Sequence, residues 1–221
     1  MQRAIFFVDG NNWYHSLRDL QLTELQRLDY KRIFDKLAGP ARTWLEARYY
    51  LPDVGALGDP NLLADQRAFL KQLREQDNRI SIIQTGRLEP RQAKNRAAQE
   101  LIEYLGALRI RIDRQVYQDL LAIGRAHRSA RVFVEKAVDV QVAVDMVEMA
   151  VADKFDVAYL LSADGDYTPA VEAVKAHGKR IFSATPASCA KLAKVVDVHI
   201  PLRRPWFDDC FRGGPPPKHS A

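Results

Sequence analysis

The chain has few residues of the kinds that bind soft metals or cross-link a fold. Its 221 residues include two cysteines, Cys189 and Cys210, which are far from any Cys-x-x-Cys spacing, and five scattered histidines. Structural zinc sites need clustered cysteine and histidine, and disulfide scaffolds need several regularly spaced cysteines. We therefore expect neither, and predict two free thiols, one partly buried and one in a terminal tail.

Long hydrophobic runs are missing as well. No apolar run approaches the roughly 20 residues that a bilayer span requires. Met1 is followed almost at once by a strand-like run at 4–8, without the basic start, apolar stretch and cleavage site of a secretory signal. We expect a cytoplasmic protein that does not engage a membrane.

Two common enzyme signatures do not occur either. No Gly-x-Gly-x-x-Gly follows the first strand, which disfavours a dinucleotide-binding domain. A phosphohydrolase of the haloacid-dehalogenase type also has an aspartate after its first strand, but needs a second acid two residues later. After Asp9 that position is Asn11. A metal-dependent phosphohydrolase is therefore the less favoured alternative.

The composition and the hydrophobic pattern predict one α/β domain. The chain is 47% hydrophobic and 28% charged, enough for a full core, and strand-like runs alternate with helical patterns as in a parallel sheet with crossovers. The expected strands are 4–8, 43–50, 80–84, 132–134, 157–162, 179–184 and 196–200. The expected helices are 11–20, 30–37, 60–76, 97–105, 138–152, 168–177 and 186–195, while 109–118 fits either a strand or a helix.

Basic residues concentrate in one stretch. The net charge is +5 and the pI is near 9.2, and the segment 87–131 has ten Lys and Arg against five acids. Its excess of five equals that of the whole chain, which favours contact with nucleic acid over a solvated helix face. We predict a basic insertion at about 90–130, lying over the site, with nucleic-acid contacts from Arg87, Arg91, Lys94 and Arg96.

Four carboxylates lie just beyond strand-like runs. Asp9 ends the first, Asp139 follows the fourth, and Asp164 and Asp166 follow the fifth. Ligands of open parallel sheets bind beyond the carboxyl ends of the strands, so these acids are expected to converge. Clustered carboxylates repel one another unless they are protonated or neutralised by a cation, and hard oxygen ligands select magnesium or manganese. The sequence predicts a Mg²⁺ or Mn²⁺ site.

Neighbouring polar residues are candidates for supporting roles. Asn12, Ser162 and Lys136 lie beside the acids, where they would contact bound water, a metal or a phosphate. Asp145 comes six residues after Asp139, rotated by about 240° and about 9 Å along a helix, so it would not share the same ion. A supporting position or pairing with an arginine is expected for Asp145.

Each acid also has a structural alternative. Asp9 and Asp139 are placed to cap the helices that follow them, and Asp164 and Asp166 are placed to form a turn. Three aromatic residues beside the acids would either stack on bases or pack in the core: Trp13, Tyr14 and Tyr167.

Three segments, taken together, resemble the motifs of the NYN domain, in particular its LabA/DUF88-type bacterial branch. They are Phe-Val-Asp-Gly-Asn-Asn at 7–12, Glu-Lys-Ala-Val-Asp at 135–139 and Leu-Leu-Ser-Ala-Asp-Gly-Asp-Tyr at 160–167. The resemblance spans about residues 3–200. It implies a relation to PIN-like nucleases, a three-layer α/β/α sandwich with a mainly parallel central sheet, and a Mg²⁺- or Mn²⁺-dependent site acting on RNA. Ala137 and Ala163 stand where these motifs commonly have glycine, which puts the local backbone geometry in question.

The resulting prediction is a metal-dependent ribonuclease. A domain over residues 1–200 would hydrolyse phosphodiester bonds of single-stranded RNA with Asp9, Asp139, Asp164 and Asp166, and 201–221 would be a Pro/Gly-rich flexible tail. The alternative is an RNA-binding or regulatory NYN module with little turnover. The sequence leaves open RNA against DNA, endonuclease against exonuclease, and whether the chain forms a homo-oligomer.

Overall fold

The computed structural model describes residues 1–54, 60–108, 112–127 and 129–214, with the backbone alone at 60, 62, 87, 89–94 and 129–135. The chain divides into two compact units. The first unit is formed by Met1–Arg87 together with Lys136–Ala221, and the second by Leu88–Glu135.

A parallel sheet forms the centre of the first unit. The strands have the order β4-β3-β2-β1-β5-β6-β7, and six of them, from β3 to β7, pair in parallel. Residues 88–94 of β3 and 129–135 of β4 belong to the second unit. Their bounds are β1 Gln2–Asp9, β2 Arg42–Asp53, β3 Ile80–Lys94, β4 Ser129–Lys136, β5 Val157–Leu161, β6 Arg180–Thr185 and β7 Val198–Pro201. The chain moves outward from β1 through β2 to β3, and then returns to β5 on the other side of β1. The switch point of the sheet therefore lies between β1 and β5.

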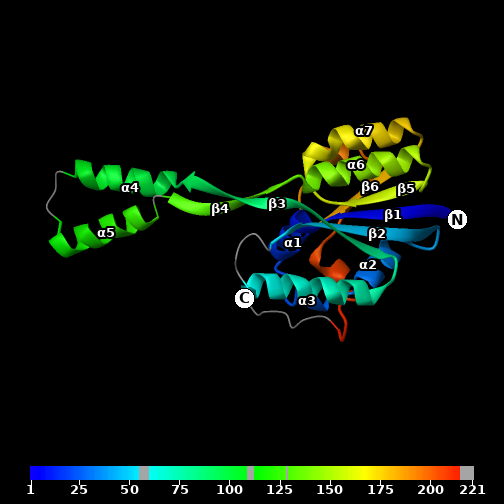
Figure 1. Cartoon of the computed structure of the whole chain (residues 1–221), viewed down its shortest axis with the longest axis horizontal. Coiled ribbons are helices and arrows are strands. Elements are labelled where there is room, and N and C mark those ends of the chain that lie inside the picture. The colour runs from blue at the N-terminus through cyan, green and yellow to red at the C-terminus, as the bar shows by residue number, and fades with distance from the viewer. Residues whose placement is uncertain (55–59, 109–111, 128, 215–221) are drawn as a thin grey trace. The chain divides into compact units, whose positions relative to one another are not determined.

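Helices cover both faces of this sheet (Figure 1). One face carries α1 Gly10–Asp19, α2 Tyr30–Ala38 and α3 Pro60–Gln76, and the other carries α6 Val138–Val151 and α7 Thr168–Ala176. The predicted three-layer α/β/α sandwich with a mainly parallel sheet is confirmed. Among the described residues, no helix combines the length and apolar character needed to cross a bilayer.

The first strand shows why its sequence is continuously apolar. Ala4, Phe6 and Val8 enter the core beneath α1, α2 and α3, whereas Ile5 and Phe7 enter the core beneath α6 and α7. A strand buried on both faces needs apolar residues at every position. Asp9, which ends this run, is therefore unusual as a buried carboxylate at the end of an apolar strand.

The second unit contains a helical pair. Its helices are α4 Arg96–Ala107 and α5 Arg114–Ala126, which pack against each other. Gly124 allows their close approach, since a Cβ there would lie 2.9 Å from Cγ1 of Ile102. The described part of the ambiguous range 109–118 begins a helix, and residues 109–111 lie outside the described residues.

Two predictions near the C-terminus are wrong. The range 186–195 contains only a short 3₁₀ turn, Leu192–Lys194, instead of a full helix. The chain after Pro201 is packed as far as it is described: Leu202, Phe207 and Cys210 are buried, and Phe211 bridges to Leu28. Apolar residues within 202–211 join the core beneath α1 and α2. The prediction of a flexible tail relied on the proline and glycine residues and overlooked these apolar ones. Residues 215–221, with the proline triplet, lie outside the described residues.

The two cysteines are free thiols, as predicted, but both are buried. Burial raises the pKa of Cys210 to about 12 and also raises the pKa of Cys189. Cys210 is therefore a core residue, not the tail thiol that the sequence suggested.

The backbone distinguishes the two alanines that replace glycines of the family motifs. Ala137, directly before α6, has a φ of +75°, whereas Ala163 is not among the positive-φ residues. We expect Ala137→Gly to raise the free energy of unfolding by about 0.5 to 1 kcal/mol, because an alanine in this region costs about 1–2 kcal/mol and glycine returns part of that as chain entropy. Ala163→Gly is the matched control and should lower stability. Urea unfolding of the two variants measures both effects, and stabilisation at residue 163 alone contradicts the expectation.

Candidate active site

Asp9 is buried where β1 ends, with 7% of the residue exposed. The backbone N–H of Asn12 donates to its Oδ1 over 3.1 Å, which caps α1. Its Oδ2 accepts two further bonds, from Ser162 Oγ at 3.2 Å and from Tyr167 Oη at 3.0 Å. Three donors therefore hold this carboxylate in one orientation.

The same network continues across the switch point. The N–H of Ala163 donates to Asn12 Oδ1 over 2.9 Å, and the N–H of Asp164 donates to Ser162 Oγ over 3.1 Å. Asp164 in turn caps the short helix Gly165–Tyr167 (η3), its Oδ1 accepting from the N–H of Asp166 at 2.9 Å. The loop after β5 is thus bonded to the start of α1. The capping predicted for Asp9 and the turn predicted for Asp164 both occur, and Asn12 and Ser162 hold them together.

The hydroxyl of Tyr167 contacts Asp9 and is influenced by the charges of two further acids. Burial raises the pKa of Tyr167, and the carboxylates of Asp9, Asp139 and Asp164 raise it further. Burial also raises the pKa of Asp9, and the charge of Asp164 adds to that effect. Asp139 lies exposed in the first turn of α6. The topology therefore brings acids from three separate segments of the chain to one edge of the sheet.

A lysine that the sequence analysis missed approaches this edge. The Nζ of Lys191 lies 3.6 Å from Oδ1 of the exposed Asp166. Its aliphatic chain lies across Gly165, where an added Cβ would be 2.6 Å from Lys191 Cδ. Lys191 belongs to the turn that follows β6, far from any motif, so its spacing along the chain contained no hint of this contact.

Asp145 is held by other partners. Its carboxylate accepts from Arg48 at 2.9 Å, Tyr50 Oη at 2.7 Å and Gln141 at 2.7 Å. Of the two roles expected for Asp145, the structure shows the pairing with an arginine. Burial and the neighbouring carboxylate raise the pKa of Tyr50, so its hydroxyl stays a proton donor.

The three aromatic residues beside the acids differ in exposure. Trp13 is fully buried and packs near Phe207, and Tyr167 is 2% exposed, so both follow the core alternative. Tyr14 is 43% exposed. The role of Tyr167 as a hydrogen-bond donor to Asp9 was not anticipated from the sequence.

Of the predicted basic contacts, Arg87 belongs to the first unit, whereas Arg91, Lys94 and Arg96 belong to the second. Arg96 is exposed and pairs with Glu100 at 2.7 Å. The side chains of Arg87, Arg91 and Lys94 lie outside the described residues. Lys136 is exposed at the end of β4 and takes part in a further interaction.

The donor types suit a hard cation. The carboxylate of Asp9 is contacted by a backbone N–H and by the hydroxyls of Ser162 and Tyr167, and carboxylate oxygens are ligands that favour magnesium or manganese. Oδ2 of Asp9 uses both lone pairs on Ser162 and Tyr167, so Oδ1 retains the free one. Within the described ranges, no three Asp, Glu, His or Cys side chains lie close enough together to hold an ion. The carboxylates of Asp9, Asp139 and Asp164 are thus of the type that such an ion takes as ligands, but their described positions do not bring three of them to one ion.

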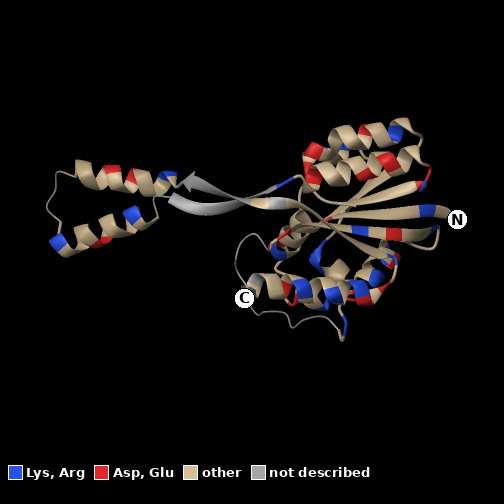
Figure 2. Ribbon diagram, in the orientation of Figure 1, with Lys and Arg blue, Asp and Glu red and all other residues tan. Residues whose placement is uncertain are grey.

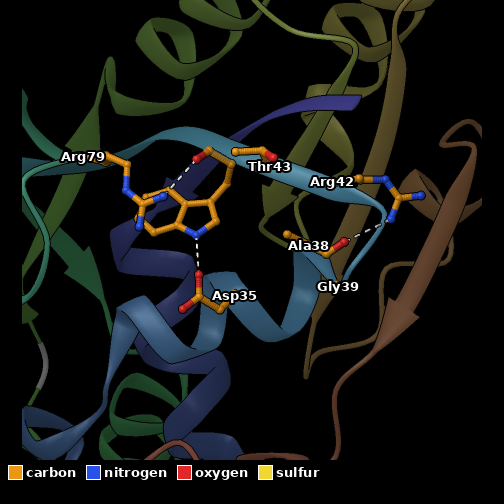
Figure 3. A pocket seen from close by; sticks show the side chains of 7 residues that line it. Asp35, Ala38, Gly39, Arg42, Thr43 and Arg79 are labelled. Carbon is orange, nitrogen blue, oxygen red and sulfur yellow. Dashed lines mark hydrogen bonds between the residues drawn. The ribbon is translucent and has the colours of Figure 1, made fainter. Parts of the chain in front are cut away.

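A separate concavity lies at the amino end of β2. It has a volume of about 260 Å³ and is lined by Asp35, Ala38, Gly39, Arg42, Thr43, Trp44 and Arg79. The guanidinium of Arg79 lies over the indole of Trp44, which donates to Asp35 over 2.7 Å. Arg79 and Asp35 are labelled in Figure 3. Arg79 also pairs with Asp77 at 2.6 Å. These polar groups bind one another, and the concavity lies at the opposite end of the strands from Asp9.

The bonds of Asp145 predict a structural effect. Asp145→Asn should lower the free energy of unfolding by about 2 kcal/mol, because the buried carboxylate loses its charge-assisted bond to Arg48. Asp164→Asn, at a partly exposed carboxylate, should change stability by less than about 1 kcal/mol. Urea unfolding at pH 7 compares the two. A larger loss at residue 164 than at residue 145 contradicts this assignment.

Asp9→Asn is expected to remove a pH-dependent loss of stability that the wild type shows without metal. Because the folded pKa of Asp9 lies above the usual 3.8, the stability linked to its proton is fully present below 3.8 and is lost as the pH rises through the folded pKa. Asparagine does not ionise, so the variant does not lose this stability as the pH rises. Unfolding in urea with EDTA from acidic to neutral pH should show an advantage of the variant that grows with pH. A stability difference between the two proteins that does not change with pH contradicts a buried charge at this position.

Comparison with known proteins agrees with the fold and the motifs. The NYN domain matches residues 61–203, a range that contains Asp139, Asp164 and Asp166 and starts after Asp9. A crystal structure of a protein of unknown function from Vibrio parahaemolyticus has the same fold, with a TM-score of 0.55, 18% identity, and 92% of this chain and 94% of that one covered. No curated protein matches. The chain belongs to the NYN domain family, and thereby to the PIN-like nuclease superfamily.

Proposed function

We propose that this protein is a metal-dependent ribonuclease that hydrolyses phosphodiester bonds of single-stranded RNA. The observation that supports this most directly is the hydrogen-bonded junction at the switch point, where the buried Asp9 is bonded through Ser162 to the loop that carries Asp164 and Asp166. Such an uncompensated group of acids is the electrostatic complement of a divalent cation. Membership in a family of the PIN-like nuclease superfamily supports phosphodiester hydrolysis as the reaction.

The residues of the site have two proposed roles, metal binding and orientation of Asp9. Asp9, Asp139, Asp164 and Asp166 would hold Mg²⁺ or Mn²⁺, which when bound activates water and offsets charge on the phosphate. Asn12, Ser162 and Tyr167 orient Asp9 through the hydrogen bonds described above.

A cytoplasmic location is part of the proposal. Two free, buried thiols are supporting observations, because reduced cysteines are typical of that compartment.

A second candidate is an RNA-binding NYN module with little turnover. The observation that favours it is that no three acids lie within ligand distance of one ion in the described residues. The two candidates differ in a single measurable property, metal-dependent cleavage.

Cleavage assays separate these candidates. We expect the wild type to cut labelled single-stranded RNA with Mg²⁺ or Mn²⁺ and not with EDTA, and to act less on single-stranded DNA and duplexes. Asp9→Asn and Asp164→Asn should each lower the cleavage rate by at least about 100-fold. Replacing a residue that only hydrogen-bonds to a metal ligand already lowers activity by about 10- to 100-fold. Glu172→Gln, which removes an exposed acid on α7, is the control and should retain the rate.

Two results would count against the catalytic assignment. One is cleavage that EDTA does not stop, and the other is equal cleavage by wild type and both aspartate variants. RNA binding by a wild type that does not cleave would establish the module instead.

A further inference from the structure

A basic groove runs along α3 in the first unit. The concavity has a volume of about 300 Å³ and lies between α3 and the far parts of β2 and β3. Leu63 and Leu70 contribute apolar surface. Its polar lining consists of Asp53, Gln66, Arg67, Lys71, Arg74 and Gln84. We call it the α3 groove.

Helix spacing places its three cations on one face. Arg67, Lys71 and Arg74 follow one another at intervals of four and three residues, and all are exposed. Lys71 is 79% exposed and only loosely paired with Glu75, at 3.9 Å. Neither Arg67 nor Arg74 has a hydrogen-bond or ion-pair partner in the part of the chain that the structure describes. Figure 2 shows the Lys and Arg positions along α3.

The groove reaches the edge of the sheet that carries the acids. In the register of β1 with β2, Asp9 pairs with Tyr50, and Asp53 follows three residues later on the same strand. At about 3.3 Å per residue, Asp53 lies on the order of 10 Å beyond the level of Asp9. A ligand extended along this edge would therefore pass from the groove to the acidic site.

We propose that the α3 groove binds the phosphate backbone of single-stranded RNA, a few nucleotides away from the acidic site. This inference rests on the proposed function for its substrate class. An acidic site repels a polyanion, so binding needs cations beside it, and unpaired guanidinium groups bind phosphate through paired hydrogen bonds. Arg67 and Arg74 are separated by about 10 Å along the helix axis, which spaces them for different phosphates of one strand. The groove contributes contacts to phosphates and no reading of base sequence.

The test measures binding apart from cleavage. Fluorescence anisotropy with a 5′-labelled oligouridylate in EDTA compares wild type, Arg67→Gln/Arg74→Gln and the control Lys154→Gln/Arg180→Gln. The control removes the same charge from exposed positions, one in the turn after α6 and one at the start of β6. Loss of two phosphate contacts should make the slope of log K against log salt shallower by about 1.4, and weaken binding on the order of tenfold at 0.1 M salt.

The outcomes keep this proposal separate from the nuclease assignment. A groove variant with the slope and affinity of the control overturns the proposal, whether or not the wild type cleaves RNA. Weaker binding by the groove variant alone supports it, even where the wild type shows no metal-dependent cleavage and the nuclease assignment falls. A polyglutamate peptide that competes as well as RNA of equal charge would point to an acidic protein partner and overturn it too.

Discussion

The fold of this NYN domain places a carboxylate where an apolar residue would otherwise continue the strand. Asp9 is buried at the end of β1, and a buried charge requires hydrogen-bond donors. Those donors come from α1, from the loop after β5 and from η3, so that satisfying one carboxylate ties both sides of the switch point together. The positions of Asp164 and Ser162 follow from this requirement.

The burial of Asp9 beside other acids lowers the stability of the fold, while the proposed function requires these acids. Acids that repel one another weaken the folded state without a cation, and burial of Asp9 adds to that cost, as its raised pKa shows. Such a cost to stability is common where a charge serves a function, which is the role proposed for Asp9. Lys191 beside Asp166 and the cations of α3 then supply positive charge outside the buried centre, where water still screens it. In the proposed function this positive charge would attract an anionic substrate, while the carboxylate of Asp9 has hydrogen-bond donors and no cation as its partners among the described residues.

Much of the architecture was predictable because local and global signals agree. The helices at 10–19, 30–38 and 60–76 each begin at a residue that favours a helix start, Asp9, Asp29 or Pro60, and each matches its prediction within one or two residues. The prediction for the C-terminal segment was wrong because it relied on local amino-acid composition, which does not show long-range contacts. Proline and glycine after residue 200 suggested a loose tail, yet Phe207 and Phe211 are buried against distant parts of the chain.

The sequence alone determined the fold class and the order of the acids, because both depend on short-range patterns: apolar runs that end in aspartate and glycine or proline at the turns. Only the tertiary structure decided which acid is buried and which pairs with an arginine. It also identified Tyr167 and Lys191 as neighbours of the acids and revealed the α3 groove. Tyr167 binds a residue 158 positions away, and Arg48 binds one 97 positions away. Such contacts depend on how strands are ordered in the sheet, which no local pattern records.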